Sequence, residues 1–323
     1  MPDTVANLGP APPAHPPEPS DGAQPSGAAP KVWLDYDQAA LDAAYGAKAM
    51  AVHAPNQMQV VGRMVASSGS MRARIGEPQA FRYGPSAIEQ LYYYPPGVPN
   101  APIHVHVHGG AWRQRRVETI LFPAEAFIRA GVGFAMFDFT AVDETGGDLV
   151  PMLEQVCAGL AWLARHARQL GGDPGRLFVS GFSSGAHLAS AAMASDWTTR
   201  GFARNPFKAA LLFSGVYDLR PLRLASSFSY IGFTDEIEDR MSAQRHADRI
   251  DIPTLIAVGA QETPELLRHA EAFAGALEAA GKPVQRLRCE GHNHYEMMES
   301  LGHPYSPLGR AAIAQALQPS EDA

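Results

Sequence analysis

The stretch Gly181-Phe182-Ser183-Ser184-Gly185 reads G-x-S-x-G and joins two segments of different character. Residues 176–180 form an apolar run that predicts a strand, and the small residues of 186–194 predict a helix. A serine on so sharp a turn is pushed out of the sheet, and the N-terminus of the new helix points at whatever the serine attacks. We therefore expect Ser183 to be an exposed nucleophile on a turn that needs its two glycines.

A second glycine motif lies upstream, where residues 103–110 read I-H-V-H-V-H-G-G before Ala111 and Trp112. This pattern predicts a buried strand that runs into a glycine turn. Acyl transfer builds negative charge on an oxygen, which preorganised N–H donors stabilise. Alone, the turn would be an ordinary strand end. With Ser183 downstream, we interpret it as an oxyanion hole formed by the backbone N–H groups of Gly110, Ala111 and Ser184.

A nucleophilic serine also needs a base and an acid, which follow it along the chain in the order Asp or Glu, then His. Residues 253–259 predict a strand, and Glu262 lies on the loop just past it. Residues 284–289 predict the last strand, and the next loop carries both His292 and His294. Spacing alone does not separate these two histidines.

Two other carboxylates compete with Glu262 for the role of the acid. Asp218 follows a predicted strand at residues 209–214, and Glu265 lies one turn into the helix predicted to run to about residue 280. The pattern favours Glu262, but only by a small margin, because Asp218 also follows the end of a predicted strand. The alternative for Glu262 itself is a loop residue or a helix cap.

The alternation of predicted strands and helices after residue 81 indicates a mostly parallel sheet covered on both faces. We predict further strands at residues 87–94 and 132–138, and helices at residues 120–130 and 149–170. His104, His106 and His108 alternate on one face of their strand, which raises the possibility of a zinc site. We expect no metal and no cofactor, because no H-E-x-x-H helix, carboxylate cluster or C-x-x-C pair accompanies them.

The N-terminal part of the chain predicts two regions of different character. Residues 1–31 are rich in Pro, Ala, Gly and Ser, so we expect a disordered tail, with a Pro-rich docking peptide as the alternative. Residues 32–75 are interpreted as a cap segment, with a helix at 34–50 and a less regular stretch to residue 74. Residues 76–323 would form the catalytic domain. The candidates for lining a subsite beneath the cap, with core packing as the alternative, are Trp33, Tyr36, Tyr45 and Met58.

Composition agrees with a soluble enzyme and says little more. The chain has 323 residues, 46% hydrophobic, with a net charge of −7 and no basic stripe, so we expect neither a nucleic acid nor an anionic membrane as partner. Its two cysteines, Cys157 and Cys289, fall in a predicted helix and strand and are expected to be reduced, buried thiols. We see no transmembrane-length run and no signal peptide, which predicts a cytoplasmic location. The oligomeric state is left open, with a homodimer as one expectation.

The chain also resembles a known family, from about residue 33 to about residue 317. The resemblance is to the arylformamidase (kynurenine formamidase)-like branch of the α/β-hydrolases, which neighbours the hormone-sensitive-lipase-like esterases. The matching stretches are residues 171–190 with 195–197, the H-G-G-A-W of 108–112, and residues 36–45, 214–219, 258–265 and 293–295. The resemblance implies an α/β-hydrolase fold, a mostly parallel central sheet flanked by helices, with an N-terminal helical cap segment.

Residue by residue, the resemblance implies Ser183 as the nucleophile and His294 rather than His292 as the base. The acid falls on Glu262, where the family commonly has Asp. Gly110 and Ala111 would supply the oxyanion hole, and the supporting residues are His108, Gly109 and Trp112. Residues 138–144 depart from the family pattern at a loop that borders the pocket, which leaves the substrate specificity open.

Together these observations predict a metal-free serine hydrolase that cleaves a small carboxylic ester or an aryl-formamide or amide through an acyl-enzyme. A non-catalytic ligand-binding protein on the same fold is the alternative, because a fold alone does not fix a function. Such a protein usually lacks the serine or the histidine, whereas every position of the machinery is filled in this chain.

Overall fold

The computed structural model describes residues 29–113 and 117–318. Within them, one sheet has eight strands in the order β10-β9-β8-β7-β5-β6-β4-β3. Strands β5 to β10 run parallel to one another, while β4 pairs antiparallel with β6 and β3 antiparallel with β4. The mostly parallel sheet is therefore confirmed. The strands are β3 (Gln79–Arg82), β4 (Gln90–Tyr94), β5 (Ala101–Val107), β6 (Gly133–Phe137), β7 (Gly172–Phe182), β8 (Ala209–Phe213), β9 (Thr254–Gly259) and β10 (Val284–Cys289).

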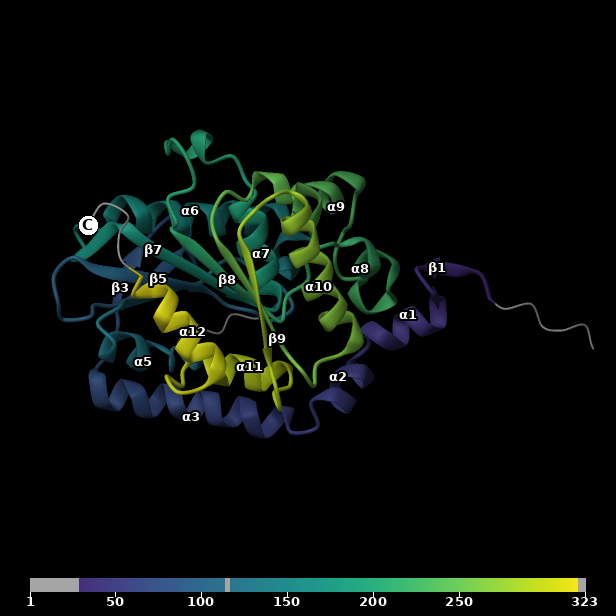
Figure 1. The fold of residues 1–323 in the computed structure, drawn as a ribbon, viewed down its shortest axis with the longest axis horizontal. Helices are drawn as coiled ribbons and strands as arrows, with labels where there is room; N and C mark the ends of the chain where they lie inside the picture. The colour runs from purple at the N-terminus through teal and green to yellow at the C-terminus, as the bar shows by residue number, and fades with distance from the viewer. Residues whose placement is uncertain (1–28, 114–116, 319–323) are drawn as a thin grey trace, which may run out of the picture.

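Helices cover both faces of this sheet (Figure 1). In β8, Ala210 and Leu212 join the core formed with α6, α7 and α10. Leu211 and Phe213 join the core formed with α3 (Gln57–Ile75), α5, α11 and α12. Successive side chains of a strand point to opposite faces, so a strand buried on both faces must be apolar throughout. The helices after β5 are α4 (Val117–Ile120), α5 (Ala124–Arg129), α6 (Val150–His166), α7 (Ser184–Met193), α8 (Arg220–Leu224), α9 (Asp235–Met241), α10 (Pro264–Ala279), α11 (His294–Leu301) and α12 (Pro307–Ala316).

Two of these helical regions differ from the expected boundaries. Residues 120–130 form the end of α4 and then α5, which starts after Pro123, instead of one helix. The helix expected at 149–170 begins at Val150 and ends at His166. Residues 167–171 then turn the chain into β7.

Residues 29–75, the part of the N-terminal region that the structure describes, contain a two-stranded ribbon and three helices. These are β1 (Lys31–Trp33), β2 (Tyr36–Asp37), α1 (Gln38–Tyr45), α2 (Ala47–His53) and α3 (Gln57–Ile75). The helix expected at 34–50 begins only at Gln38 and breaks at Gly46. Of the tail predicted for residues 1–31, residues 1–28 lie outside the described part of the chain.

The prediction of a less regular stretch before residue 74 was wrong, because residues 57–75 form the long helix α3. Its buried positions Val60, Met64, Ser68 and Met71 have helical spacing, but Ser68 interrupts the apolar stripe that would have revealed the helix. The Ser68 Oγ atom lies within hydrogen-bond distance of two carbonyl oxygens, those of Met64, at 3.0 Å, and Thr119, at 2.8 Å, which share its single O–H donor. A polar residue is thus accommodated on the buried face.

Polar contacts hold α3 against the rest of the molecule, along the lower edge of Figure 1. Arg63 donates two hydrogen bonds of 2.7 Å to the Glu299 carboxylate on α11. Near the other end of α3, Arg74 binds Glu125 of α5. Bidentate pairs of this kind fix an orientation as well as a distance.

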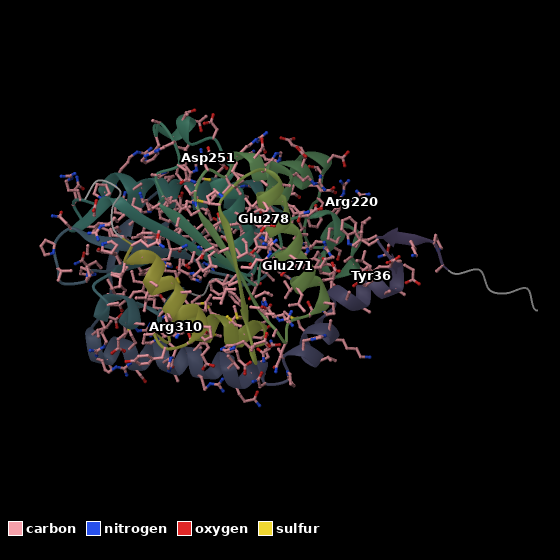
Figure 2. The ribbon with its side chains drawn as sticks, in the orientation of Figure 1. Tyr36, Arg220, Asp251, Glu271, Glu278 and Arg310 are labelled. Atoms are coloured by element: carbon pink, nitrogen blue, oxygen red, sulfur yellow. The ribbon has the colours of Figure 1, made fainter. Side chains whose placement is uncertain are left out.

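Charged side chains mark the edge strand β10. Arg286 of β10 donates from Nε to Glu271 at 3.1 Å and from Nη2 to Glu278 at 2.9 Å, both on α10 (Figure 2). Exposed ion pairs add little stability, but charges on an edge strand oppose its pairing with another sheet.

Cys157 and Cys289 are free and buried, in agreement with the sequence. Burial raises the pKa of both thiols, that of Cys289 to about 11, so neither is a reactive thiolate near neutral pH. Among residues 29–113 and 117–318, no helix is both long enough and apolar enough to span a bilayer.

The junction between β7 and α7 is too tightly packed for larger residues. A Cβ atom on Gly185 would lie 2.2 Å from the Val107 carbonyl oxygen and 2.4 Å from that of His108, both at the end of β5. A Cβ on Gly181 would lie 2.5 Å from the Gly185 oxygen. The two glycines let α7 start directly against β5, which leaves Ser183 at the top of the turn.

We expect Gly185→Ala to destabilise the fold by about 3 kcal/mol or more, because neither backbone carbonyl beside it can move away. The matched control is Gly69→Ala in α3, where an added Cβ has no atom within 4 Å. That change should stabilise the protein by about 0.5–1 kcal/mol, since alanine is the better helix former. Urea unfolding of both variants provides the measurement. Equal stability of Gly185→Ala and the wild type would contradict the packing described for this junction.

Candidate active site

Ser183 adopts a backbone conformation that residues other than glycine rarely take, with φ 55° and ψ −125°. Such a conformation costs about 1–3 kcal/mol and persists only where surrounding packing fixes it. The Ser183 N–H donates to the Phe213 carbonyl oxygen at 3.1 Å, which ties the turn to the end of β8. The Ser183 side chain lines a cavity instead of packing into the core.

His294 lies between Ser183 and Glu262. Its Nε2 atom is 3.1 Å from the Ser183 Oγ, and its Nδ1 atom is 2.7 Å from the Glu262 Oε2. Because the carboxylate accepts from Nδ1, Nε2 is free to take a proton from the serine hydroxyl. His292 bonds instead through Nδ1 to the carbonyl oxygen of Glu290 at 2.8 Å. The structure therefore brings His294, and not His292, to the serine.

A capping box fixes the position of His294 at the first turn of α11. The Asn293 side chain accepts from the N–H groups of Tyr295, at 3.1 Å, and Glu296, at 3.2 Å. Glu296 accepts in return from the Asn293 N–H at 2.9 Å. These reciprocal bonds satisfy the free N–H groups of the helix start, so the residue next to the cap has a defined orientation.

Glu262 is buried, and both of its carboxylate oxygens are engaged. Oε2 contacts His294, while Oε1 accepts from the Ser214 hydroxyl at 2.7 Å and from the Gly259 N–H at 2.8 Å. Sequence reasoning gave no role to Ser214, which directly follows β8 and has φ 55°. The available signal was a Ser-Gly pair at the end of the strand predicted for residues 209–214.

The rival acids belong to other networks. Asp218, in the segment that follows β8, accepts a hydrogen bond from Arg245 Nη2 at 3.0 Å. Glu265 accepts from the Tyr45 hydroxyl at 2.7 Å and from Arg268 Nη2 at 2.8 Å, which joins α1 to α10. Within the described residues, neither carboxylate forms a hydrogen bond or an ion pair with His294 or Ser183.

The turn after β5 lies beside Ser183 in a strained conformation, with φ values of 131°, 53° and 60° at Gly110, Ala111 and Trp112. The Trp112 N–H donates to Ser184 Oγ at 3.2 Å, so this turn and the serine turn hold each other. Gly110, Ala111 and Ser184 line the cavity, and within the described residues no protein acceptor binds their N–H groups. Their positions therefore suit an external oxyanion.

The three supporting residues predicted from the sequence all contact this turn. His108 donates from Nδ1 to the Gly109 carbonyl oxygen at 2.8 Å and stacks on Phe139. A Cβ on Gly109 would come within 2.8 Å of the Phe182 carbonyl oxygen, so only glycine fits there. The Trp112 indole Nε1–H donates a hydrogen bond to His187 Nδ1, a contact that the sequence did not indicate.

The cavity above Ser183 has a volume of about 590 Å³. Its walls come from the α1–α3 region, the turn after β5, residues 216–230 and the start of α11. Of the four subsite candidates in the N-terminal segment, Tyr45 lines this cavity, whereas Trp33, Tyr36 and Met58 are not among its described lining residues.

His104 and His106 are core residues. Both are fully buried and bond to the Ser180 hydroxyl, at 2.7 Å from His104 Nε2 and 2.8 Å from His106 Nδ1. Burial lowers the pKa of His104 to about 3 and that of His106 well below its ordinary value, so both are neutral. No cluster of three or more His, Cys, Asp or Glu side chains within residues 29–113 and 117–318 could hold a metal ion.

Residues 90–263, more than half of the chain, match the sequence family described as BD-FAE. The chain belongs to the BD-FAE family. It is 26% identical over 226 residues to a kynurenine formamidase of Danio rerio, which covers 68% of this chain and 75% of that protein. It is also 33% identical over 121 residues to carboxylesterase NlhH of Mycobacterium tuberculosis, which covers 36% of this chain and 37% of that protein.

Among solved structures, a protein from Silicibacter sp. TM1040 has the same fold, with a TM-score of 0.72 at 23% identity over 85% of this chain and 98% of that one. The resemblance seen in the sequence is thus confirmed. This BD-FAE family member is a serine hydrolase of the carboxylesterase/arylformamidase type. The family match ends at residue 263, just after Glu262, and therefore does not include His294. The place of His294 in the site comes from its distances to Ser183 and Glu262.

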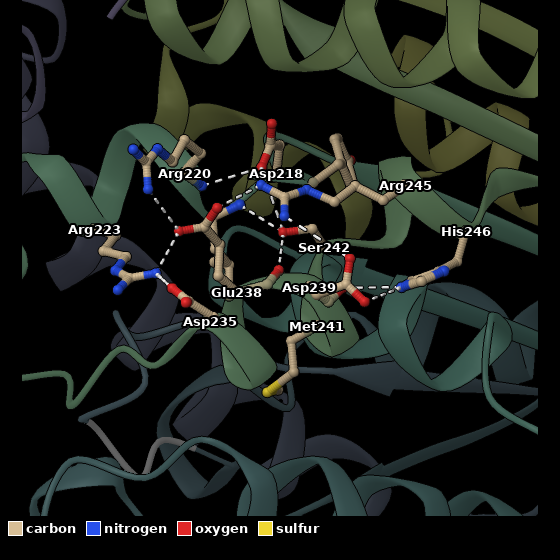
Figure 3. A network of polar contacts seen from close by, with 12 residues as sticks. Asp218, Arg220, Arg223, Asp235, Glu238, Asp239, Met241, Ser242, Arg245 and His246 are labelled. Carbon is tan, nitrogen blue, oxygen red and sulfur yellow. Dashed lines mark hydrogen bonds and ion pairs between the residues drawn. The ribbon is translucent and has the colours of Figure 1, made fainter. Parts of the chain in front are cut away.

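One cavity wall of this BD-FAE hydrolase depends on an ion-pair network (Figure 3). Five residues of the segment 216–230 line the cavity, and α9 follows this segment. The buried Glu238 of α9 accepts from Arg245 at 2.7 Å, Arg223 at 3.0 Å and Arg220 at 3.4 Å. Arg220 and Arg223 lie on α8, so one carboxylate joins the two short helices that carry this wall.

Glu238→Gln should destabilise the protein by about 1–2 kcal/mol at pH 7, because three arginines lose their shared anion. Burial raises the pKa of Glu238, but hydrogen bonds from Arg245 and Arg223 outweigh it and hold the pKa below its ordinary 4.5. A depressed carboxyl pKa contributes stability above the unfolded value and loses it as the pH falls through the folded value. The deficit of the variant should therefore shrink below about pH 4.5.

Urea unfolding at pH 7 and pH 3.5 measures this effect. The control is Asp239→Asn, since the Asp239 side chain is 63% exposed and lies 3.9 Å from Arg245, a geometry that contributes little. The account would be contradicted if the Glu238→Gln deficit were the same at both pH values, or if Asp239→Asn lost as much stability.

Proposed function

We propose that Ser183, His294 and Glu262 form the catalytic triad of an esterase or arylformamidase reaction. The observation that carries the proposal is the unbroken chain of contacts from Ser183 Oγ to His294 Nε2, at 3.1 Å, and from His294 Nδ1 to Glu262, at 2.7 Å. Ser183 attacks the acyl carbonyl carbon while His294 takes its proton. Glu262 orients the imidazole and stabilises it once it is charged.

The carbonyl oxygen becomes negatively charged in this step, and the N–H groups of Gly110, Ala111 and Ser184 would bind it. Loss of one such donor typically costs about 3 kcal/mol of transition-state stabilisation. His294 then gives its proton to the leaving alcohol or amine as the bond to the acyl carbon breaks. Water attacks the acyl-enzyme with His294 as base, which releases the acid and restores the Ser183 hydroxyl.

The relatives support the proposed substrate class. A kynurenine formamidase and a carboxylesterase are among the similar proteins, so we propose a small carboxylic ester or an aryl-formamide or amide as substrate. Esters demand less help for the leaving group than amides, which makes short-chain esters the practical assay substrates. Residues 32–75 would act as a cap, because Tyr45, Met50 and Met64 line the cavity.

The setting of the reaction is also a proposal. The net charge of −7 supports a free small-molecule substrate, with neither nucleic acid nor an anionic membrane as partner. We propose the cytoplasm as the location, in keeping with two cysteines that are buried and not joined in a disulfide.

Ser183→Ala should lower kcat for p-nitrophenyl acetate by at least about 10⁴-fold and leave the unfolding transition nearly unchanged, since the oxyanion donors alone give little turnover. A fluorophosphonate probe should label the wild type once, and intact mass measurement should find no label on the variant. The matched control is Ser70→Ala, at an exposed position of α3, which should keep both turnover and labelling.

Three results would count against the proposal. They are strong residual turnover in purified Ser183→Ala, labelling of that variant, and a wild type that neither reacts with the probe nor hydrolyses the ester. The last result would favour the alternative of a non-catalytic binding protein.

A further inference from the structure

One wall of the cavity is built from aromatic side chains that come from three separate parts of the chain. Phe228 packs edge-on against Tyr45 at 5.9 Å and against Trp112 at 6.0 Å between ring centroids, and it contacts Tyr230 at 6.1 Å. Tyr45 belongs to α1, Trp112 to the turn after β5, and the other two to the segment after α8. All four residues line the cavity above Ser183.

The polar ends of these aromatic side chains are already bound within the protein. The Tyr45 hydroxyl donates to Glu265 at 2.7 Å, and the Tyr230 hydroxyl donates to the Ala111 carbonyl oxygen at 3.1 Å. The Trp112 indole N–H donates to His187 Nδ1 at 3.1 Å. The wall therefore offers a ligand mainly ring faces and edges.

The described residues that line the cavity include no Lys, Arg, Asp or Glu. Nearby charges are paired outside the lining: Arg113 donates to Asp143 at 2.8 Å while its guanidinium lies 4.6 Å above the Tyr230 ring, and Glu265 is bound by Arg268. A carboxylate or ammonium group on a bound substrate would lose its hydration here and find no opposite charge among these residues.

We propose that this hydrolase selects substrates whose group in the aromatic-walled cavity is uncharged and apolar, preferably an aryl group. Neutral aryl esters and neutral anilides fit this chemistry, whereas aryl esters or anilides with an ionised carboxylate or amino-acid group are rejected. The inference rests on the proposed esterase or arylformamidase function, and it narrows the substrate class of the same site.

Methyl 4-acetoxybenzoate and 4-acetoxybenzoate test the inference, because the two aryl acetates have nearly the same shape and differ by one negative charge at pH 7. After division by the rate of hydroxide hydrolysis of each ester, kcat/KM should be at least 100-fold higher for the methyl ester. A ratio near one, with turnover of both esters lost in Ser183→Ala, would overturn the inference and leave the proposed function standing. No Ser183-dependent turnover of either ester would overturn both.

A designed charge provides the second arm. Ser227 is exposed and lines the cavity beside Phe228. Ser227→Arg should raise the ratio of anionic to neutral ester turnover, both as kcat/KM, at least tenfold, while Ser227→Gln, which is polar but uncharged, should leave this ratio as in the wild type.

Ser229→Arg, two residues further on and outside the described lining, controls for long-range attraction. An equal gain in Ser229→Arg, or no gain in Ser227→Arg, would contradict the claim that the discrimination comes from the lack of a charged side chain among the described lining residues.

Discussion

The close approach of α7 to the end of β5 is the constraint on which the rest of the site depends. Gly185 lies where any side chain would collide with the carbonyl oxygens of Val107 and His108. Because the helix starts so near that strand, the residue before it must take a positive φ, and Ser183 is forced into the cavity. The same approach brings the turn after β5 beside the serine, where Trp112 N–H binds Ser184 Oγ.

The other half of the site comes from three neighbouring strand ends. Ser214 follows β8, Glu262 follows β9 and His294 follows β10, and in a parallel sheet these ends share one edge. The polar chain from Ser214 through Glu262 and His294 to Ser183 therefore crosses four adjacent loops. The strain at Ser183 and at Ser214, both with φ 55°, is offset by a core that covers both faces of the sheet.

Sequence reasoning reached the residues whose positions follow from local pattern. Ser183 stands between a strand and a helix, and Glu262 and His294 follow strands, so their shared edge could be predicted from the alternation of elements. Pattern alone favoured Glu262 over Asp218 by a small margin, because the arginine that binds Asp218 lies 27 residues away along the chain. Spacing did not separate His294 from His292, and the family resemblance selected Glu262 and His294. Sequence reasoning did not find α3, where Ser68 on the buried face hides the helical pattern.

Apart from Tyr45, which the sequence offered as a subsite candidate, the aromatic wall of the cavity was not predicted, because contacts between distant parts of the chain build it. Residues 216–249 contain short helices that an ion-pair network around Glu238 holds together, and no apolar periodicity marks them. The aromatic wall combines Tyr45, Trp112 and Phe228, which lie far apart in sequence. Tertiary contacts alone bring such residues together. The catalytic centre could therefore be predicted from the sequence more fully than the substrate specificity.

The most direct measurement is a crystal structure of the wild type after reaction with an aryl phosphonate. We expect a covalent bond from phosphorus to Ser183 Oγ, with the phosphoryl oxygen about 2.7–3.1 Å from at least two of the N–H groups of Gly110, Ala111 and Ser184. His294 should remain between the phosphorus-bearing Ser183 and Glu262. Phosphonate on another residue, or a phosphoryl oxygen turned away from all three N–H groups, would contradict the proposed catalytic site.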